Sequence, residues 1–320
     1  MMDKTSEREV GVFVFNGLLE SGKTNMVKRF LDNPQICVGR KIVLVVCEEG
    51  LEEYSEKGIA DRGITLLNLE EESDYTPAFF ASIERMYHPD IVAIEYNGVW
   101  AGALPVTTEY PDGWIVAEVM TTVDSTTFDA YSKNLRAMMI EQFRITDIVV
   151  FNRFTDDAKK FSYRSLVKAS NMSAQVVYEY ENGDIDTTFD ASPFDLTKDE
   201  VEIGDTDYGV FYFDIMDNAA KYEGKILALH TMAVKIEGVN MPGFLIGRFA
   251  MTCCANDIQF FSLYAQNRMT FRNKAWYNVR AKVVLVDSSI YGEAPGERLP
   301  ALEVLSMTPA AAPEEEVVTF

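Results

Sequence analysis

Basic residues are scarce in this sequence of 320 residues: 29 lysines and arginines face 50 aspartates and glutamates, and the net charge is −21. A field of that sign repels phosphate backbones and anionic lipid surfaces at long range. Nucleic acid and acidic membranes are therefore poor partners, and we expect no nucleic-acid role. A nucleotide is still allowed, because backbone N–H groups and one lysine can form a phosphate site whatever the net charge.

Cysteine and histidine are also rare, at four and two residues. A chain of this length does not need disulfides, so we expect reduced thiols, and a zinc site would have to draw on cysteines and carboxylates. No apolar run reaches the roughly 18 residues that suggest a membrane span. The polar start MMDKTSEREV lacks the apolar core of a secretory signal. We therefore expect a cytoplasmic protein with no direct membrane insertion.

Residues 1–190 do contain a regular alternation of short apolar runs and amphipathic segments. The runs VFVF, IVLVV, ITLLNL, IVAIEY, IVAEVMTTV, DIVVF and QVVYEY have the length and composition of buried strands. Segments with helical spacing, such as TNMVKRFLDN and PAFFASIERMY, lie between them. This order predicts an α/β domain, in which helices cover both faces of a parallel sheet.

The composition changes after that domain. Residues 191–207 have few apolar side chains and predict an acidic, solvated linker. Residues 208–297 contain strand-like runs separated by Gly, Pro or Asn, which predict a smaller, mostly-β domain built as an antiparallel barrel or sandwich. Residues 298–320 are rich in Ala, Pro and Glu and predict a flexible tail.

A phosphate-binding motif stands near the start of the first domain. Residues 17–24, GLLESGKT, fit G-x-x-x-x-G-K-[ST] directly after a predicted strand and before a predicted helix. Gly17 and Gly22 permit a loop whose N–H groups point at phosphates, and the helix N-terminus adds partial positive charge. Lys23 would reach the β- and γ-phosphate oxygens, and the Thr24 hydroxyl would ligate Mg²⁺. A chance glycine-rich turn is the alternative, but it leaves the coincidence of strand, motif and helix unexplained.

A nucleotide site of this kind also needs acidic residues near the metal. Glu95 ends the run IVAIE at the carboxyl end of a strand, where open α/β sheets bind ligands, and would act as a Walker B-type carboxylate. A surface glutamate at a strand end is the alternative. Gly98 follows at a place where its N–H can contact the γ-phosphate. Glu48 and Glu49 end an earlier strand and would hold a metal-bound water, although a solvated charge cluster explains them equally well.

These segments carry a family resemblance. The order GLLESGKT, VVCEEG, IEYNG, TTVDSTTFDAY and EQFRITDIVVFNR resembles the CobW/HypB/UreG class of P-loop GTPases, and most closely its CobW branch. The resemblance implies GTP hydrolysis coupled to metal-ion delivery or metallocofactor assembly, with Asp124 in the VD element and Asn152 in the base-recognition loop. The family's loop reads N-K-x-D, whereas here Thr155 stands in place of that Asp and two aspartates follow it.

The predicted functional residues of this domain form three sets. The catalytic set is Lys23 and Glu95. The nucleotide-binding set is Gly17, Leu18, Leu19, Glu20, Ser21, Gly22, Lys23, Thr24, Asn25, Gly98, Asn152 and Arg153. The Mg²⁺ set is Thr24, Glu48, Glu49 and Glu95. The C-x-C-C metal motif of CobW-type chaperones is absent, and the acidic run EEESD in its interval is usually a solvated face. A direct metallochaperone role is weakened accordingly.

The second domain resembles the soluble C-terminal domain of a bacterial family of permease-associated proteins, the YcgQ type. The pattern R-F-x-x-x-C-C-x-x-D carries this resemblance, which implies an OB-like barrel and a link to metal or transport. Cys253, Cys254 and Asp257 would form a soft site for Zn²⁺, completed by His230, water or a second chain. The alternative is one cysteine in the core and one on the surface, because neighbours on a strand point to opposite faces.

The leading hypothesis is a Mg²⁺-dependent, slow GTPase that acts in metal-ion homeostasis or metallocofactor assembly, with a metalloenzyme or a metal transporter or permease as its partner. The alternative is a non-catalytic, nucleotide-sensing adaptor that regulates a transporter or metal-related partner. A small-molecule kinase is a third hypothesis, for which the sequence shows neither an acceptor pocket nor a lid. Phosphate release by the purified protein separates the first two.

Overall fold

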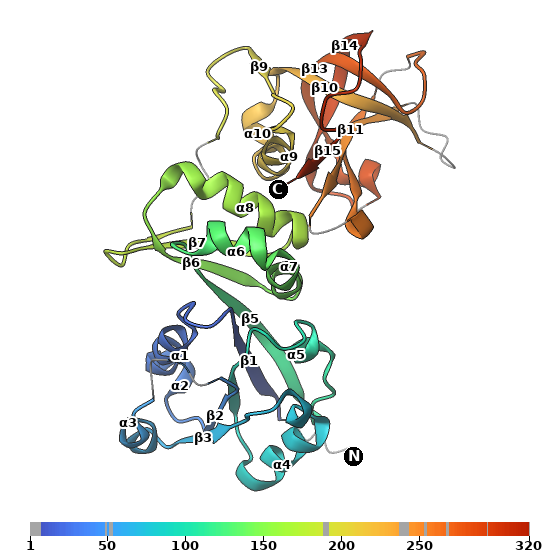
Figure 1. Ribbon diagram of the computed structural model, residues 1–320. Coiled ribbons are helices and arrows are strands. Elements are labelled where there is room, and N and C mark those ends of the chain that lie inside the picture. The colour runs from blue at the N-terminus through green and yellow to red at the C-terminus, as the bar shows by residue number, and fades with distance from the viewer. Residues whose placement is uncertain are drawn as a thin grey trace, which may run out of the picture. The chain divides into compact units, whose positions relative to one another are not determined.

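The structure is a computed structural model that describes residues 8–48, 50, 54–187, 192–236, 243–252, 255–266, 269–292 and 294–319. The chain divides into two compact units, and Figure 1 labels most of their elements. The α/β unit comprises residues 1–157 and 170–187, and the barrel unit comprises residues 158–169 and 188–320.

The α/β unit contains an eight-stranded sheet in the order β3-β2-β4-β1-β5-β6-β7-β8. Neighbouring strands from β3 to β7 are parallel, whereas β8 runs antiparallel to β7. The predicted parallel sheet is confirmed, and its parallel strands contain the predicted apolar runs. The strands are β1 (Val10–Asn16), β2 (Ile42–Val46), β3 (Ile64–Asn68), β4 (Ile91–Glu95), β5 (Trp114–Asp124), β6 (Ile148–Phe154), β7 (Gln175–Tyr180) and β8 (Ile185–Asp186).

Helices cover both faces of this sheet, as the alternation of side chains along its central strands shows. Val43 and Val45 on β2 belong to the same buried cluster as Phe80 of helix α4, whereas Leu44 belongs to a second cluster with Val27 of helix α1. Successive strand residues point to opposite faces, so the sheet separates two cores. The helices are α1 (Lys23–Asp32), α2 (Pro34–Cys37), α3 (Glu56–Asp61), α4 (Pro77–Tyr87), α5 (Leu104–Thr107), α6 (Phe128–Asn134) and α7 (Arg136–Arg144), with a 3₁₀ turn at Glu72–Asp74.

The barrel unit contains a seven-stranded sheet in the order β15-β11-β12-β14-β13-β10-β9, and an additional pairing of β10 with β11 closes five of its strands into a barrel. Within the barrel β12 and β14 are parallel and the other pairs are antiparallel. The predicted mostly-β, OB-like domain is thus confirmed as a small closed barrel. Its strands are β9 (Glu200–Glu202), β10 (Ile226–Lys235), β11 (Phe244–Met251), β12 (Gln259–Ala265), β13 (Ala275–Asp287), β14 (Arg298–Pro309) and β15 (Val317–Thr319).

The described part of the barrel unit also contains α9 (Tyr208–Asp217), α10 (Ala219–Tyr222) and all but the last residue of α8 (Lys160–Ser170). Short 3₁₀ turns lie at Asp157–Lys159, Ala255–Asp257 and Ser288–Tyr291. Most of α8 groups with this unit by its contacts, although the sequence places it in the first domain. No helix within the described ranges is long and apolar enough to cross a membrane.

The predicted tail over residues 298–320 is corrected by the structure. Arg298–Pro309 is strand β14, which lies between β12 and β13 in the barrel. Its Leu302 and Val304 are buried in the core, whereas Glu303 and Leu305 between and after them are exposed. The content of Ala, Pro and Glu suggested a solvated segment, but the alternation of apolar and exposed residues is that of a half-buried strand.

The predicted linker over residues 191–207 is corrected in part. Glu200–Glu202 forms β9, which pairs in parallel with β10. Its Val201 is 4% exposed and joins the barrel core. Glu200 and Glu202, on either side of Val201, lie on the solvated face of this edge strand. The acidic composition therefore predicted a linker where the chain forms a strand.

Candidate functional site

The glycine-rich loop lies between β1 and α1, as its motif requires. Gly17 and Gly22 have φ angles of 137° and 100°, in the region that favours glycine. A Cβ at Gly17 would lie 2.4 Å from the backbone oxygen of Thr122, and a Cβ at Gly22 would lie 2.6 Å from Nδ2 of Asn152. Both positions therefore require glycine for the backbone angle and for space.

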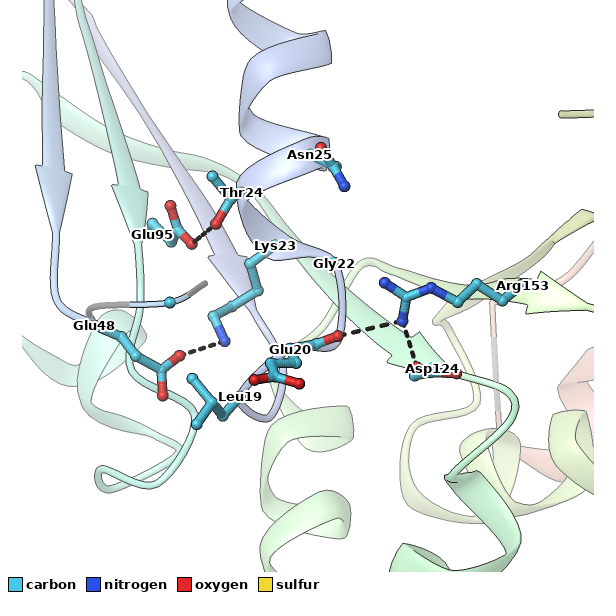
Figure 2. A pocket seen from close by; sticks show the side chains of 11 residues that line it. Leu19, Glu20, Gly22, Lys23, Thr24, Asn25, Glu48, Glu95, Asp124 and Arg153 are labelled. Carbon is cyan, nitrogen blue, oxygen red and sulfur yellow. Dashed lines mark hydrogen bonds and ion pairs between the residues drawn. The ribbon is translucent and has the colours of Figure 1, made fainter. Parts of the chain in front are cut away.

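Lys23, the first residue of α1, turns its ammonium back over this loop. Its Nζ donates hydrogen bonds to the carbonyl oxygens of Gly17 and Leu18, both at 2.9 Å. The same nitrogen lies 2.5 Å from Oε2 of Glu48, and the lysine side chain is 3% exposed. Figure 2 shows the two charged groups facing each other. The charge that the motif provides for phosphates is therefore balanced by Glu48 in this structure.

Glu95 ends β4 beside the loop. The Thr24 hydroxyl donates to Oε1 of Glu95 at 2.6 Å, and the Tyr54 hydroxyl donates to Oε2 (Figure 2 shows the first of these bonds). Burial raises the pKa of Glu95, against the opposing effect of both hydrogen bonds and of the Lys23 charge. Burial beside this carboxylate also raises the pKa of Tyr54. Sequence reasoning missed Tyr54, because no motif links it to a residue 41 positions away.

Asn152 and Arg153 hold the outer part of the loop from the end of β6. Asn152 Nδ2 donates to the carbonyl oxygen of Ser21 at 2.6 Å, and Oδ1 of Asn152 is buried without a hydrogen-bond partner. Arg153 adopts a left-handed φ of 50°, donates to the carbonyl oxygen of Glu20 at 3.3 Å and pairs with the Asp124 carboxylate. In Figure 2 its guanidinium bridges the loop and Asp124.

These side chains surround a pocket of about 370 Å³. The residues that line it are Leu19, Glu20, Gly22, Lys23, Thr24, Asn25, Glu48, Gly50, Glu95, Asp124 and Arg153. Most of the predicted nucleotide and Mg²⁺ residues are thus brought together, and Asp124 joins them from β5. Glu49 lies outside the described residues.

Four further predicted residues do not line this pocket but belong to the glycine-rich loop or contact it. Leu18 and Ser21 line a second pocket of about 320 Å³ that shares the loop as a wall. Gly98 touches the loop directly, because a Cβ on it would lie 2.0 Å from the carbonyl oxygen of Gly17. Asn152 touches it through the bond to Ser21. The loop is therefore contacted by Gly98 in the segment after β4, by Thr122 of β5, whose hydroxyl lies 2.8 Å from that of Ser21, and by Asn152 of β6.

The acidic run before α4 has a structural use. Glu72 accepts a hydrogen bond from the backbone N–H of Ala101 at 2.6 Å, and its neighbours Glu70, Glu71 and Asp74 are exposed. Among the described residues no group of three or more His, Cys, Asp and Glu side chains is arranged to hold a metal ion. The run is a solvated face with one backbone contact.

Of the predicted zinc site in the barrel unit, only Asp257 and His230 lie within the described residues. Cys253 and Cys254 lie outside the described residues, while Asp257 accepts a hydrogen bond from the backbone N–H of Thr252 at 3.1 Å. Both ring nitrogens of His230 are engaged: Nδ1 lies 3.2 Å from Asp205, and Nε2 lies 2.9 Å from the carbonyl oxygen of Ala311. His230, one of the three alternatives for the fourth ligand, thus has other partners for both ring nitrogens. Zinc binding by the cysteine pair stays a prediction.

A parallel sheet, a glycine-rich loop at the end of β1, a buried lysine and a Thr24–Glu95 pair define a P-loop nucleotide-binding protein. Comparison with family models agrees: residues 11–177 match the nucleotide-binding domain of CobW/HypB/UreG, and residues 182–318 match the DUF1980 C-terminal domain. The chain belongs to the CobW/HypB/UreG family and carries a DUF1980 domain. The resemblance drawn from the sequence is confirmed.

Three solved structures are similar to this chain at low sequence identity. The hydrogenase maturation factor HypB from Archaeoglobus fulgidus is 17% identical over 54% of this chain and 81% of its own, with a TM-score of 0.38. The Zn(II)-bound YjiA GTPase from E. coli is 15% identical over 84% of this chain and 92% of its own, with a TM-score of 0.41. A Zn(II)-bound triple mutant of YjiA is 17% identical, with a TM-score of 0.42 over 80% and 87% of the two chains. A search of curated proteins found no match.

Proposed function

We propose that this protein is a Mg²⁺-dependent GTPase with slow turnover that acts in metal-ion homeostasis or metallocofactor assembly. The observation that supports this most is the convergence of Lys23, Thr24 and Glu95 in one pocket at the glycine-rich loop. A metalloenzyme or a metal transporter is the proposed partner, in keeping with the family to which the chain belongs.

The residues beside the loop suit a hard cation. Thr24 Oγ1 and Glu95 Oε1 are oxygen donors 2.6 Å apart in the same pocket, which is the ligand type that Mg²⁺ prefers. Bound there, Mg²⁺ would neutralise charge on the β- and γ-phosphates. Glu95 would hold the metal from β4, and Thr24 from the first turn of α1.

The chain's own groups would do the remaining work by position and charge. The N–H groups of the loop and of the first turn of α1 would bind phosphate oxygens. Lys23 would leave Glu48 and pair with the β- and γ-phosphates. We assign no residue as the base that orients the attacking water, so we expect slow turnover unless a partner assists.

Guanine preference is the proposed base specificity. Asn152 and Arg153 hold the loop from the base side, and the unpartnered Oδ1 of Asn152 leaves an acceptor free. The carboxylate expected after them is displaced, and Asp157 accepts a hydrogen bond from the Tyr180 hydroxyl. Calorimetry with GTP and ATP tests this part alone: equal affinities would overturn guanine preference and leave the phosphate site intact.

Phosphate release tests the activity. Purified protein with GTP and Mg²⁺ should release phosphate, and the Lys23→Ala variant should lose at least tenfold of that rate and of the GTP affinity, because charge-assisted hydrogen bonds to phosphate are lost. Lys41→Ala is the matched control, since Lys41 is exposed and absent from the pocket lining. Binding that depends on Lys23 without any phosphate release would favour the nucleotide-sensing adaptor.

Zinc binding by the barrel unit is a separate proposal. Wild-type protein should bind about one Zn²⁺ per chain, because thiolate ligands favour this ion, and binding should weaken as pH falls, because protons compete for the thiolates. The Cys253→Ser, Cys254→Ser double variant should lose the zinc in elemental analysis. Unchanged zinc content with a lower Tm would show that the cysteines only pack the domain.

A further inference from the structure

Gln142 is a buried polar residue in the α/β unit that the proposed mechanism does not use. It lies on α7 and is 3% exposed. Its Nε2 donates a hydrogen bond to the carbonyl oxygen of Gly98 at 2.7 Å, across 44 residues of sequence. A carbonyl oxygen only accepts hydrogen bonds, so the amide nitrogen of Gln142 must face it.

Gly98 is the point at which the segment after β4 meets the nucleotide loop. A Cβ on Gly98 would lie 2.0 Å from the carbonyl oxygen of Gly17 and 3.0 Å from Nε2 of Gln142. The peptide of Gly98 is therefore packed between the first glycine of the loop and the Gln142 side chain. Movement of this peptide toward the loop would strain its close contact with Gly17, and movement away from Gln142 would break the hydrogen bond to that side chain.

The helix that carries Gln142 is fixed on its other side. The Thr146 hydroxyl donates to the carbonyl oxygen of Gln142 at 2.7 Å and lies 2.5 Å from the Thr121 hydroxyl on β5. Asn171 Nδ2 donates to the carbonyl oxygens of Phe143 and Thr146 at 3.2 and 2.9 Å. Gln142 thus extends from a helix end held by Thr121, Thr146 and Asn171 toward the segment of Gly98, which follows Glu95, the proposed Mg²⁺ ligand, by three residues.

We propose that Gln142 is a positioning residue that holds the Gly98 peptide against the nucleotide loop, so that the site distinguishes a nucleoside triphosphate from a diphosphate. The proposal rests on the proposed function, together with the expectation from the sequence that the Gly98 N–H contacts the γ-phosphate. Segments of this kind are ordered by the γ-phosphate and relax when it is lost. If the Gly98 peptide is already held in place, less conformational entropy is lost when it binds the γ-phosphate.

Gln142→Met tests the hydrogen bond, because methionine has a similar length and no N–H. With Mg²⁺ present, calorimetry should show GDP affinity within about twofold of wild type and affinity for a non-hydrolysable GTP analogue lower by about tenfold, the scale of one lost buried hydrogen bond. The rate constant kcat for phosphate release should fall as well. Gln175→Met is the matched control, because Gln175 is exposed at the start of β7 and should leave both affinities unchanged.

Gln142→Glu separates positioning from packing. An ionised carboxylate repels the Gly98 carbonyl oxygen, whereas a protonated carboxyl group can donate to it. The preference of this variant for the triphosphate analogue should therefore recover as pH falls, and that of Gln142→Met should not. Packing alone predicts that the affinities for GDP and for the triphosphate analogue change together with pH, so that the preference of the Gln142→Glu variant stays constant.

The outcomes decide between the two proposals. If wild type binds neither guanine nucleotide, the proposed function fails and this inference fails with it. If wild type binds both but the Gln142 variants lose GDP and analogue affinity equally, or show only a lower Tm, Gln142 is a packing residue and this inference alone is overturned. Unchanged affinities in both variants overturn it as well.

Discussion

The ammonium of Lys23, the first residue of α1, lies 2.5 Å from the carboxylate of Glu48, which follows β2. The pair sits over the glycine-rich loop, where Lys23 also donates to two carbonyl oxygens. Nucleotide binding in the proposed mechanism must break this ion pair, because Lys23 cannot contact Glu48 and the phosphates with the same N–H groups. The Glu48 carboxylate therefore competes with the nucleotide phosphates for the Lys23 ammonium.

Glu48→Gln should tighten nucleotide binding in the absence of Mg²⁺ by about three- to tenfold, since a neutral amide competes less for Lys23 and repels phosphate less. Calorimetry with GDP in a chelating buffer measures this directly. Glu20→Gln is the control: Glu20 lines the same pocket but its side chain makes no ion pair with Lys23. An equal gain in both variants would mean that net charge, and not the Lys23–Glu48 pair, sets the affinity.

Gly98→Ala should weaken nucleotide binding at least tenfold and lower Tm. The new methyl group would lie 2.0 Å from the carbonyl oxygen of Gly17, so the loop must shift, at the cost of about 1–3 kcal/mol that overpacking brings. Gly58→Ala on α3 is the control, because its Cβ would meet Ser55 at an ordinary 3.4 Å and alanine favours helix. Wild-type affinity in the Gly98→Ala variant would contradict the packing described here.

Arg248→Met should destabilise the barrel unit by about 2 kcal/mol, the cost of losing several buried hydrogen bonds. Arg248 is 1% exposed and donates to Asp205 and to the carbonyl oxygen of Glu315, and its guanidinium lies 5.3 Å from the Trp276 ring. Thermal unfolding measures the loss. Arg280→Met is the control, since the Arg280–Glu200 pair is exposed on both sides and should leave Tm unchanged. Equal Tm values for both variants would refute the role of Arg248.

Glu118→Gln should stabilise the protein slightly at neutral pH and have no effect near pH 4. Burial, and then the charge of Asp147, raise the pKa of Glu118 above 4.5. A carboxyl group with a raised pKa in the folded state contributes stability below its unfolded pKa and loses it as pH rises through the folded value. The half-exposed carboxylate is screened, so we expect a gain below about 0.5 kcal/mol. A lower Tm at neutral pH would contradict this, and exposed Glu109→Gln serves as control.

The sequence alone determined the alternation of strands and helices along the first domain and the position of the phosphate loop. Both features can be recognised from consecutive residues. Apolar runs of strand length indicate the strands of the sheet, and GLLESGKT places two glycines and a lysine within eight residues. The place of Glu95 at a strand end identified it, and the resemblance added Asp124 and Asn152; all three lie at or near the carboxyl ends of parallel strands. Parallel strands bring those ends to one edge, so their meeting follows from the topology.

Only the tertiary structure decided which side chains touch the loop from elsewhere and how far the barrel extends. Tyr54 reaches Glu95, and Gln142 reaches Gly98, across 41 and 44 residues without a shared motif. The Ala, Pro and Glu content of residues 298–309 predicts a tail, whereas β14 is a strand of the barrel because β12 and β13 pair with it on either side. Contacts between distant segments depend on how the strands are ordered in space, which local residue patterns do not encode.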